Sequence, residues 1–416
     1  MNDLTFNGGN IGLQVGNQQF TMRNIVFNNC VTAISQLWSW GWLYQGLTIN
    51  NCQRGIDISA NNGVDQQVGS VTIIDSTITN TPVGVITAFN SSSQPNTAGS
   101  LVLENVVLQN VATAVQQAGG GTLLAGTSGS TTIAAWGEGN QYTPNGPKRF
   151  QGQFIPTSRP ASLLSGNTYY ARSKPQYGDL PASSFQSVRS AGATGNGVTD
   201  DTTALQNCIN NASTAGTVVY FDSGTYRITN TLVFPAGSKI VGEAYPIIMS
   251  SGNFFNDMNN PKPVVQVGNP RQSASPVEWS DMIVSTQGAQ AGAIGIEFNL
   301  ATSGAPSGLW DVHVRIGGFA GSNLQASQCP TTPGSPTVNE ACIGAYMLMH
   351  VTASASGLYM ENTWLWTADH DIDSSDNTQI TIYSGRGLYI ESTAGSFWLQ
   401  VLFLLTIFHE SESGSH

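Results

Sequence analysis

The chain carries little charge. Asp, Glu, Lys and Arg make up 9% of its 416 residues, and the formal net charge is -11 with 14 basic residues. Nucleic-acid-binding proteins neutralise phosphates with clustered Lys and Arg. We therefore expect no nucleic-acid partner, and a neutral polymer suits this composition better.

Cysteine is also scarce, with five residues. No Cys-x-x-Cys pair or histidine cluster has metal-ligand spacing, so we expect no metal and no cofactor. Cys30 and Cys52 fall at the same step of neighbouring repeats, where either a buried thiol pair or a disulfide is compatible with the spacing. Cys329 and Cys342 flank a Pro-rich loop, and a disulfide is expected there in an oxidising compartment.

The first 120 residues contain a repeat of five copies. Successive copies are separated by 21, 22, 29 and 30 residues. The first apolar column of the repeat is Leu4, Ile25, Leu47, Ser76 and Val106. Nine places later comes a second column, each member preceded by Gly or Ala: Leu13, Ile34, Ile56, Val85 and Val115. Four copies place an asparagine at one step: Asn29, Asn51, Asn80 and Asn110.

This repeat predicts a right-handed parallel β-helix. Apolar residues two apart lie on one face of a strand, and a period of this length suits one circuit of a solenoid. The asparagines are expected at a buried corner, where stacked amides hydrogen-bond along the axis. Abundant Gly, Ser, Thr and Asn agree with tight turns. A β-sandwich with a chance alignment is the alternative.

The second half opens differently. Asp200, Asp201 and Thr202 predict an N-cap and an acidic first turn of a short amphipathic helix. Short strands follow, separated by Gly, Pro or Asn. A helix over the open end of a solenoid covers backbone groups that would invite edge pairing. The domains are expected at 1–118 (coils of a first β-helix), 119–185 (a Gly/Pro/Ser-rich connector), 186–399 (a second β-helix) and 400–416 (an aberrant tail).

Several motifs carry a family resemblance. The runs GATGNGVTDDTTALQ and VVYFDSGTYRI look like the opening of a pectate-lyase-like (pectin-lyase-like) β-helix domain. Further motifs narrow it: GAIGIEFNLA at 292–301, GLWDVHVRIGGFAGSNLQ at 308–325, CIGAYMLMHVTASASGLYMENTWLWTADHDID at 342–373 and SGRGLYIESTAG at 384–395. Together they resemble glycoside hydrolase family 55, the exo-β-1,3-glucanases. The resemblance implies an extracellular, monomeric enzyme with two tandem β-helices and the glucan site between them.

Two departures from the family pattern stand out. Met1 leads directly into a repeat, without opening coils or a signal peptide. At the other end, the stretch Gly-Thr-x-x-Glu-His, in which the family places its general-acid glutamate, is absent. The chain is therefore expected to be truncated at both ends and to lack the acid. The apolar run at 399–408 is shorter than the ~20 residues of a membrane-spanning helix, so no membrane contact is expected.

The second half offers a cluster of candidate site residues. Trp364 and Trp366 supply aromatic faces for a sugar ring, and Asp369 and Asp371 follow them closely. A bend must follow Trp366 if it and Asp369 are to touch one sugar. By resemblance, Glu391 is a supporting carboxylate of the pocket.

Some features near this cluster also suit a purely structural role. Asp-rich turns are commonly solvated corners of a solenoid. A buried strand glutamate such as Glu391 needs a partner, for which Arg386 is the candidate. Asp311, His313 and Arg315 alternate on one strand and are expected to share a face, which suits either an ion-pair network or a sugar site.

The first half offers SQLWSWGW. Trp38, Trp40 and Trp42 are expected on one face, as a sugar platform or as a seam between domains. By resemblance, the family positions its attacking water with neutral residues of the first domain, and Gln36 and Ser59 match that role.

These features favour an exo-acting, inverting β-1,3-glucan hydrolase that releases glucose. Two alternatives keep the fold. A polygalacturonase or pectate-lyase-like enzyme would need cations to meet uronate carboxylates, and the chain has four lysines. A non-catalytic carbohydrate-binding β-helix would bind glucan without hydrolysis.

Overall fold

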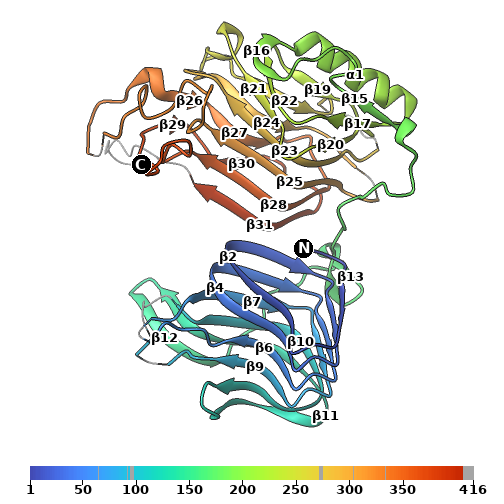
Figure 1. The fold of residues 1–416 in the computed structure, drawn as a ribbon, viewed down its shortest axis with the longest axis vertical. Coiled ribbons are helices and arrows are strands. Elements are labelled where there is room, and N and C mark those ends of the chain that lie inside the picture. Colours follow the sequence, from blue (N-terminus) through green and yellow to red (C-terminus); the bar gives the residue numbers. More distant parts are fainter. Residues whose placement is uncertain are drawn as a thin grey trace. The chain divides into compact units, whose positions relative to one another are not determined.

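The computed structural model describes residues 1–63, 65–90, 92–93, 98–270, 275–302, 304–332 and 334–405. The chain divides into two compact units, Met1–Ser173 (unit 1) and Lys174–His416 (unit 2). In each unit, parallel strands from successive coils stack on one another around an apolar interior (Figure 1).

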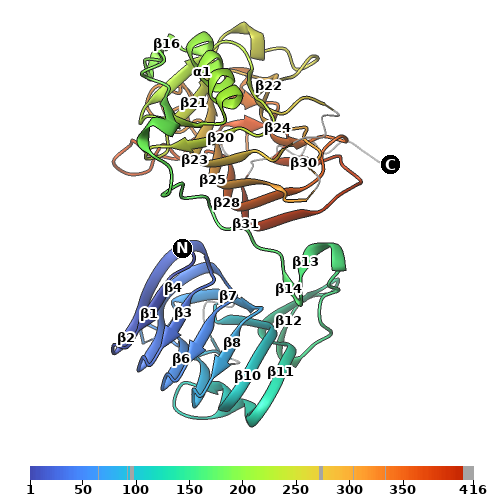
Figure 2. The ribbon, with the colours of Figure 1, turned by 90° about the vertical axis from the view of Figure 1, so that its right-hand side faces the viewer.

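Unit 1 is built almost wholly of strands. They are β1 (Thr5–Asn7), β2 (Ile11–Arg23), β3 (Val26–Asn28), β4 (Thr32–Gln45), β5 (Thr48–Asn50), β6 (Arg54–Ile58), β7 (Val68–Ile74), β8 (Thr77–Thr79), β9 (Val83–Thr87), β10 (Ser100–Gln117), β11 (Thr122–Thr143), β12 (Gly146–Gln153), β13 (Leu164–Ser165) and β14 (Thr168–Tyr169). β1, β3, β5 and β8 form one parallel ladder, of which Figure 2 shows β1, β3 and β8.

The register of the coils confirms the repeat. Phe27 pairs with Ile49, and Ile49 with Ile78, along one face. The second apolar column runs through Ile34, Ile56 and Val85 on another face. These side chains are fully buried or nearly so. Each coil therefore hides its apolar residues by stacking on the next one, as a solenoid must.

The asparagine ladder forms, but the expected burial is wrong. Asn80 Nδ2 donates to Asn51 Oδ1 at 3.0 Å, and Asn110 Nδ2 donates to Asn80 Oδ1 at 3.0 Å. These side chains are exposed. All four repeat asparagines, Asn29 included, have φ between 48° and 60°. Asparagine is favoured at this corner because it tolerates the left-handed backbone that the turn requires.

Residues 122–153 lie within the segment that the sequence assigns to a connector, yet they are strands. β11 pairs antiparallel with β10, and β12 pairs antiparallel with β11. Gly, Ser and Thr dominate the outer part of β11, so the strand has no strong apolar alternation to reveal it. The pair closes the last parallel coil of unit 1 with an antiparallel hairpin.

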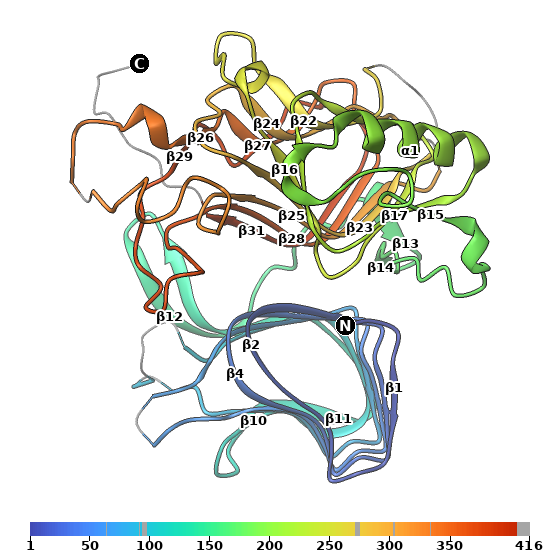
Figure 3. The same cartoon turned by 45° about the horizontal axis from the view of Figure 1, so that its top comes forward.

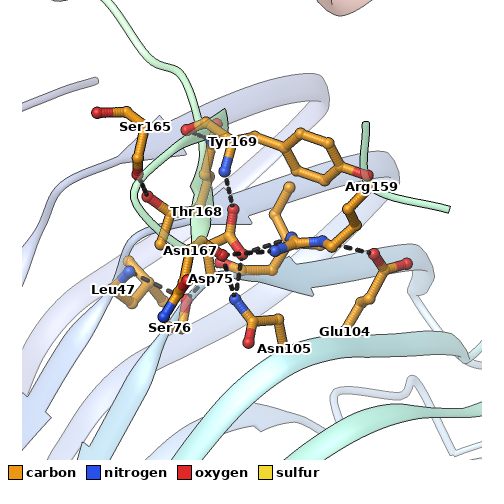
Figure 4. Close-up of polar contacts among 12 residues, drawn as sticks. Leu47, Asp75, Ser76, Glu104, Asn105, Arg159, Ser165, Asn167, Thr168 and Tyr169 are labelled. Carbon is orange, nitrogen blue, oxygen red and sulfur yellow. Dashed lines mark hydrogen bonds and ion pairs between the residues drawn. The ribbon is translucent and has the colours of Figure 1, made fainter. Parts of the chain in front are cut away.

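A polar cluster fastens residues 159–169 to the coils (Figure 4). Asp75, whose side chain is 1% exposed, forms an ion pair with Arg159 at 2.5 Å. Asn105 Nδ2 donates to the same oxygen, Oδ1, at 2.6 Å, and the other oxygen accepts from the backbone N–H of Tyr169 at 2.8 Å. The Arg159 guanidinium also lies 4.2 Å from the centre of the Tyr169 ring. One buried carboxylate therefore holds a segment more than 80 residues away in sequence.

The described residues of unit 2 form one α-helix, α1 (Thr202–Ala215), three short 3-10 helices (Ala182–Ser184, Asn253–Phe255 and Glu340–Cys342) and strands. The strands are β15 (Phe185–Ser187), β16 (Asn196–Asp200), β17 (Val218–Phe221), β18 (Thr225–Ile228), β19 (Leu232–Phe234), β20 (Lys239–Gly242), β21 (Ile247–Ser250), β22 (Lys262–Val267), β23 (Glu278–Thr286), β24 (Ala293–Phe298), β25 (Ser307–Ile316), β26 (Ile343–Ala345), β27 (Met347–Val351), β28 (Leu358–Thr367), β29 (Tyr383–Ser384), β30 (Leu388–Ile390) and β31 (Phe397–Leu405). Parallel ladders run from β15 through β17, β20 and β23, and from β19 to β30.

Helix α1 lies over the first coil of unit 2, as predicted (Figure 3). Its buried stripe is Leu205, Cys208, Ile209 and Ala212. Asp201 makes no side-chain cap to the helix, contrary to expectation. Its buried carboxylate instead accepts from the backbone N–H groups of Thr194 at 2.7 Å and Gly195 at 3.0 Å. The Asp201 carboxylate therefore fixes the loop that precedes the helix.

The structure contains the disulfide that the sequence predicts. Cys329 and Cys342 form a disulfide with a Cα–Cα distance of 5.9 Å, as expected. Cys30 and Cys52 are free and buried, so the alternative of a buried thiol pair is confirmed and the alternative of a disulfide is wrong. Burial raises the pKa of the Cys52 thiol.

The end of unit 2 continues the stack. β31 pairs in parallel with β28, with Leu358 opposite Phe397 and Leu365 opposite Leu404. Residues 400–405, assigned by sequence to an aberrant tail, therefore extend a regular strand. The rest of that tail, 406–416, lies outside the described residues.

Both units are parallel β-helices, and a capping helix opens the second. The predicted fold class, all-β with two tandem right-handed parallel β-helices, is confirmed. None of the helices in the described ranges has the length and apolar character to cross a membrane.

Candidate functional site

Trp364 and Trp366 lie on the outward face of β28. They are half-buried and alternate with buried Thr363 and Leu365. The Trp364 ring meets the His313 ring edge-on at 6.2 Å, and its backbone N–H donates to His313 Nδ1 at 3.1 Å. The strand thus places two indoles on one side of unit 2, as alternation predicts.

The bend that the sequence requires after Trp366 is present. β28 ends at Thr367, and Asp369 follows outside the strand. His370 lies between the two predicted residues: its ring is 5.2 Å from the Trp366 ring, and its Nδ1 is 2.8 Å from Asp369 Oδ1. Because the carboxylate only accepts, Nδ1 carries a proton. Trp366, His370 and Asp369 form one cluster, which we call the TADH cluster.

Asp371 is engaged elsewhere. It is 5% exposed, and it accepts hydrogen bonds from the Gln325 amide and from the backbone N–H groups of Ala326 and Asp373. Desolvation raises the pKa of Asp371, but the hydrogen bonds from Ala326, Gln325 and Asp373 outweigh it and leave that pKa below its ordinary range. These contacts give Asp371 a clear structural task, which is to hold the loop at Gln325 against the turn.

Glu391 differs from its expected setting. The glutamate follows β30, and its side chain is 45% exposed rather than buried. Its partner is His350 Nε2 at 3.0 Å, not Arg386. Arg386 lies 5.1 Å above the Tyr389 ring, and that ring stacks on His350 at 5.4 Å. Because Glu391 lies just past the strand end, it reaches solvent and needs no buried cation.

Asp311, His313 and Arg315 do not form the ion-pair network that their alternation allows. Asp311 has φ 54° and stands at a corner, where it pairs with Lys174 at 3.0 Å. The His313 ring stacks on Tyr245 at 5.4 Å. Arg315 lies over the Phe319 ring at 4.4 Å. The three side chains share the half-buried face of β25 and alternate with buried valines, as predicted, but each has a separate partner there.

His313 is expected to make unit 2 less stable in acid. Burial lowers the pKa of His313 to about 4, from an ordinary value near 6.5. The neutral ring is favoured in the folded state, so its contribution is complete above pH 6.5 and is lost as the pH falls toward 4. We expect a loss on the order of 2–3 kcal/mol in the free energy of unfolding.

Urea titrations at pH 7 and pH 4 check this. The control is His313→Asn, whose Oδ1 can accept from Trp364 without titrating. Between pH 7 and pH 4, the free energy of unfolding of the variant should fall by about 2–3 kcal/mol less than that of the wild type. Equal slopes for the two proteins would contradict the assignment.

Gln36 lies inside unit 1. It pairs with Val15 of the neighbouring coil, as the repeat predicts, and is 1% exposed. Its Oε1 accepts from the Tyr44 hydroxyl at 3.0 Å, while Nε2 is buried without a hydrogen-bond partner in the described part of the chain. Burial also raises the pKa of Tyr44 well above its ordinary value. A polar pair therefore sits in an otherwise apolar interior.

Ser59 is bound in a local turn. Its Oγ donates to Asp57 Oδ1 at 2.6 Å, and its backbone N–H donates to the same oxygen at 3.0 Å. Gln36 bonds to Tyr44 instead, so the structure does not join Gln36 and Ser59 directly.

Trp38, Trp40 and Trp42 do not share one face, contrary to expectation. Trp38 and Trp40 are 39% and 60% exposed, whereas Trp42 is 5% exposed and belongs to the apolar core. The buried face of β4 changes between Trp40 and Trp42, and a register shift lies just before Trp38. Alternation holds only along a regular strand, and an irregularity changes the face on which later side chains lie.

Two histidines that the sequence did not indicate join these candidates. His370 is adjacent in sequence to Asp369, so the sequence could have predicted a His–Asp pair there. His350 is 41 residues from Glu391, and only the register of β27 with β30 brings them together. Unit 2 thus carries two candidate groups, the TADH cluster and the Glu391–His350–Tyr389 group. Unit 1 separately carries the exposed surface of Trp38 and Trp40.

Comparisons with known proteins show what this chain is similar to. A family model described as rhamnogalacturonase A/epimerase, pectate lyase-like, matches residues 1–57 and 185–296. A protein of Cochliobolus carbonum named glucan 1,3-beta-glucosidase is 50% identical over 402 residues, which are 96% of this chain and 50% of that protein. A probable glucan endo-1,3-beta-glucosidase of Arthroderma benhamiae is 38% identical over 96% of this chain and 56% of its own length.

A solved structure of sacteLam55A from Streptomyces sp. SirexAA-E aligns with 95% of this chain and 67% of its own, at 13% identity and a TM-score of 0.35. The chain spans about half the length of the curated relatives that it matches. Its similarity to the first of them nonetheless runs through nearly all of its own residues. Nearly all of this chain is therefore similar to about half of the Cochliobolus carbonum and Arthroderma benhamiae glucan glucosidases.

Proposed function

We propose that this chain is part of a β-1,3-glucan hydrolase. The single observation that carries the proposal is the 50% identity, over 96% of the chain, to a protein named glucan 1,3-beta-glucosidase. The outward tryptophans of both units support it, since aromatic faces pack against the apolar side of a sugar ring. We further propose an extracellular monomer that needs no nucleic acid or membrane partner.

The mode of attack is proposed to be exo-acting and inverting, with glucose as product. Inversion requires a proton donor on one side of the glycosidic bond and a positioned water on the other. Gln36 and Ser59 are proposed to position the water, and Glu391 is proposed as a supporting carboxylate. Trp364, Trp366, Asp369, Asp371 and Trp40 are proposed as substrate contacts.

An assay of the protein with laminarin tests the reaction. Laminarin should yield glucose as the first product, appearing initially as the α-anomer by NMR, because an inverting enzyme reverses the β-linkage. Early release of longer oligosaccharides would mean endo attack, which the name of the Arthroderma benhamiae relative suggests for that protein. Unsaturated or reducing uronides from polygalacturonate, with no glucose from laminarin, would replace the proposal by the uronate alternative. Binding of laminarin without any product would favour a carbohydrate-binding β-helix.

Gln36→Leu separates a catalytic role from a structural one. Leucine restores the apolar column around Val15 and removes the buried Nε2 that has no partner. Stability should therefore change by less than about 1 kcal/mol, since the loss of the Tyr44 hydrogen bond is offset by apolar packing. If Gln36 positions the water, kcat on laminarin should fall about 100-fold or more. Unchanged kcat, with an unchanged melting temperature, would remove Gln36 from the site.

A further inference from the structure

A groove lies wholly within unit 1, beside the exposed tryptophans. Its volume is about 700 Å³, within the range of ligand-binding clefts. Trp38 and Trp40 of β4 line one part of it, and Glu138 and Tyr142 of β11 line another. Residues almost 100 positions apart thus meet at one surface of this unit.

The rings in the groove are exposed, and one of them, Trp38, packs closely on a neighbouring strand. Trp40 is 60% exposed and Tyr142 is 72% exposed. Trp38 rests directly on Gly16, where an added Cβ would come within 2.6 Å of the indole. Only glycine therefore permits this position of the Trp38 ring. Flat apolar faces held in place cost little entropy to bind against.

The floor of the groove is polar and incompletely bonded. Glu138 is 4% exposed; its Oε2 accepts from Gln151 Nε2 at 3.1 Å, and the Thr87 side chain is also close to the carboxylate. No described residue meets hydrogen-bond geometry at its Oε1. Ser39 Oγ and both amide atoms of Gln66 are likewise buried and without partners there. Such atoms are costly in a folded protein and are expected to meet a ligand. Burial raises the pKa of Glu138 to about 7, so its carboxyl can donate as well as accept near neutral pH.

The lining also indicates which ligands do not fit. No Lys or Arg stands among the described residues that line the groove. A phosphate or uronate polymer would bring negative charge next to Glu138 without a cation to meet it. A neutral sugar offers hydroxyls for the floor and an apolar ring face for the indoles.

We propose that this groove of unit 1 is a binding site for a neutral hexose chain, with Trp38, Trp40 and Tyr142 stacking on sugar rings and Ser39, Gln66 and Glu138 bonding their hydroxyls. Its identification with β-1,3-glucan rests on the proposed function. The groove itself requires no hydrolysis and is complete within one unit.

Equilibrium binding to the full chain tests the proposal. Laminarihexaose is titrated into the wild type by calorimetry, beside cellohexaose and a hexamer of galacturonic acid. We expect saturable binding of laminarihexaose and none of the acidic hexamer. Trp40→Ala should weaken binding about tenfold, as loss of a central aromatic contact does. Tyr142→Ala removes a second exposed ring and should also weaken it.

Glu138→Gln and a control variant sharpen the result. Glutamine keeps the shape and hydrogen-bonding capacity of a protonated carboxyl, so affinity should stay within about threefold, whereas Glu138→Ala should lose about tenfold. Phe254→Ala removes a ring that is 40% exposed in unit 2 and should leave binding unchanged. Melting temperatures confirm that each variant is folded.

Two outcomes overturn the site. They are the absence of saturable laminarihexaose binding, and binding that survives both Trp40→Ala and Tyr142→Ala. Preference for cellohexaose would keep the groove and reassign its ligand to another neutral glucan. Glucose release is measured separately: binding that Trp40→Ala abolishes, in a protein that hydrolyses nothing, would retain the groove and refute the proposed function. If the protein hydrolyses laminarin but these variants do not change its binding, the proposed function is retained and the groove is refuted.

Discussion

Asp75→Ala is expected to lower the free energy of unfolding of unit 1 by about 3–5 kcal/mol. The carboxylate is the common partner of Arg159, Asn105 and the Tyr169 backbone. Its removal leaves a guanidinium, 17% exposed, without its closest anion, although Glu104 remains 3.3 Å away. A charge left in a desolvated place costs far more than the net value of the pair that it once formed. Urea unfolding of wild type and variant measures the difference.

The repeat supplies a matched control in Asp3. It occupies the corresponding corner of an earlier coil, with φ 59° against 52° for Asp75, and it accepts from Asn24 as Asp75 does from Asn105. It is exposed and forms no pair with an arginine in the described chain. Asp3→Ala should cost no more than about 1 kcal/mol. Equal losses at the two corners would show that backbone geometry, and not the buried ion pair, sets the stability.

Asp201→Ala is expected to destabilise unit 2 by about 2–4 kcal/mol. The buried carboxylate accepts from the N–H groups of Thr194 and Gly195 and from the Thr194 hydroxyl at 3.0 Å. Without it, two backbone donors lose their partner in an interior position, and the loop that leads into α1 loses its anchor. The change in the midpoint of urea unfolding, at constant m-value, measures the loss.

The neighbouring Asp200 provides the comparison for Asp201. It is exposed and bonds to the hydroxyls of Thr202 and Thr229 at 2.5 and 2.6 Å. Solvent can replace those partners, so Asp200→Ala should cost about 1 kcal/mol or less. A larger loss at Asp200 than at Asp201 would reverse our assignment of the two aspartates.

Much of the fold could be predicted because the apolar residues of the repeat recur at a regular spacing in the sequence. The columns through Phe27 and Ile34 fix which residues share a coil face, and stacking then follows from the need to bury them. Residues 122–153 could not be predicted in the same way. Their Gly, Ser and Thr side chains carry no apolar period, and their pairing depends on the exposed edge of β10.

Less of the candidate site could be predicted. Alternation placed Trp364 and Trp366 on one face, because β28 is regular there. It failed for Trp42, because the buried face of β4 changes along the strand. Periodicity assumes a regular strand, and β4 has a register irregularity next to Trp38. The partners of Glu391 and Asp371 come from other coils or loops, so local sequence could not name them.

The sequence by itself determined the winding of the chain, the capping helix and the Cys329–Cys342 disulfide. The reason is that each depends on spacing along one segment and on the apolar or polar nature of its residues. Only the tertiary structure decided which polar groups are buried and who their partners are. Asp75 meets Arg159, and Glu138 joins Trp40 at a groove, because stacked coils bring together residues that no local pattern connects.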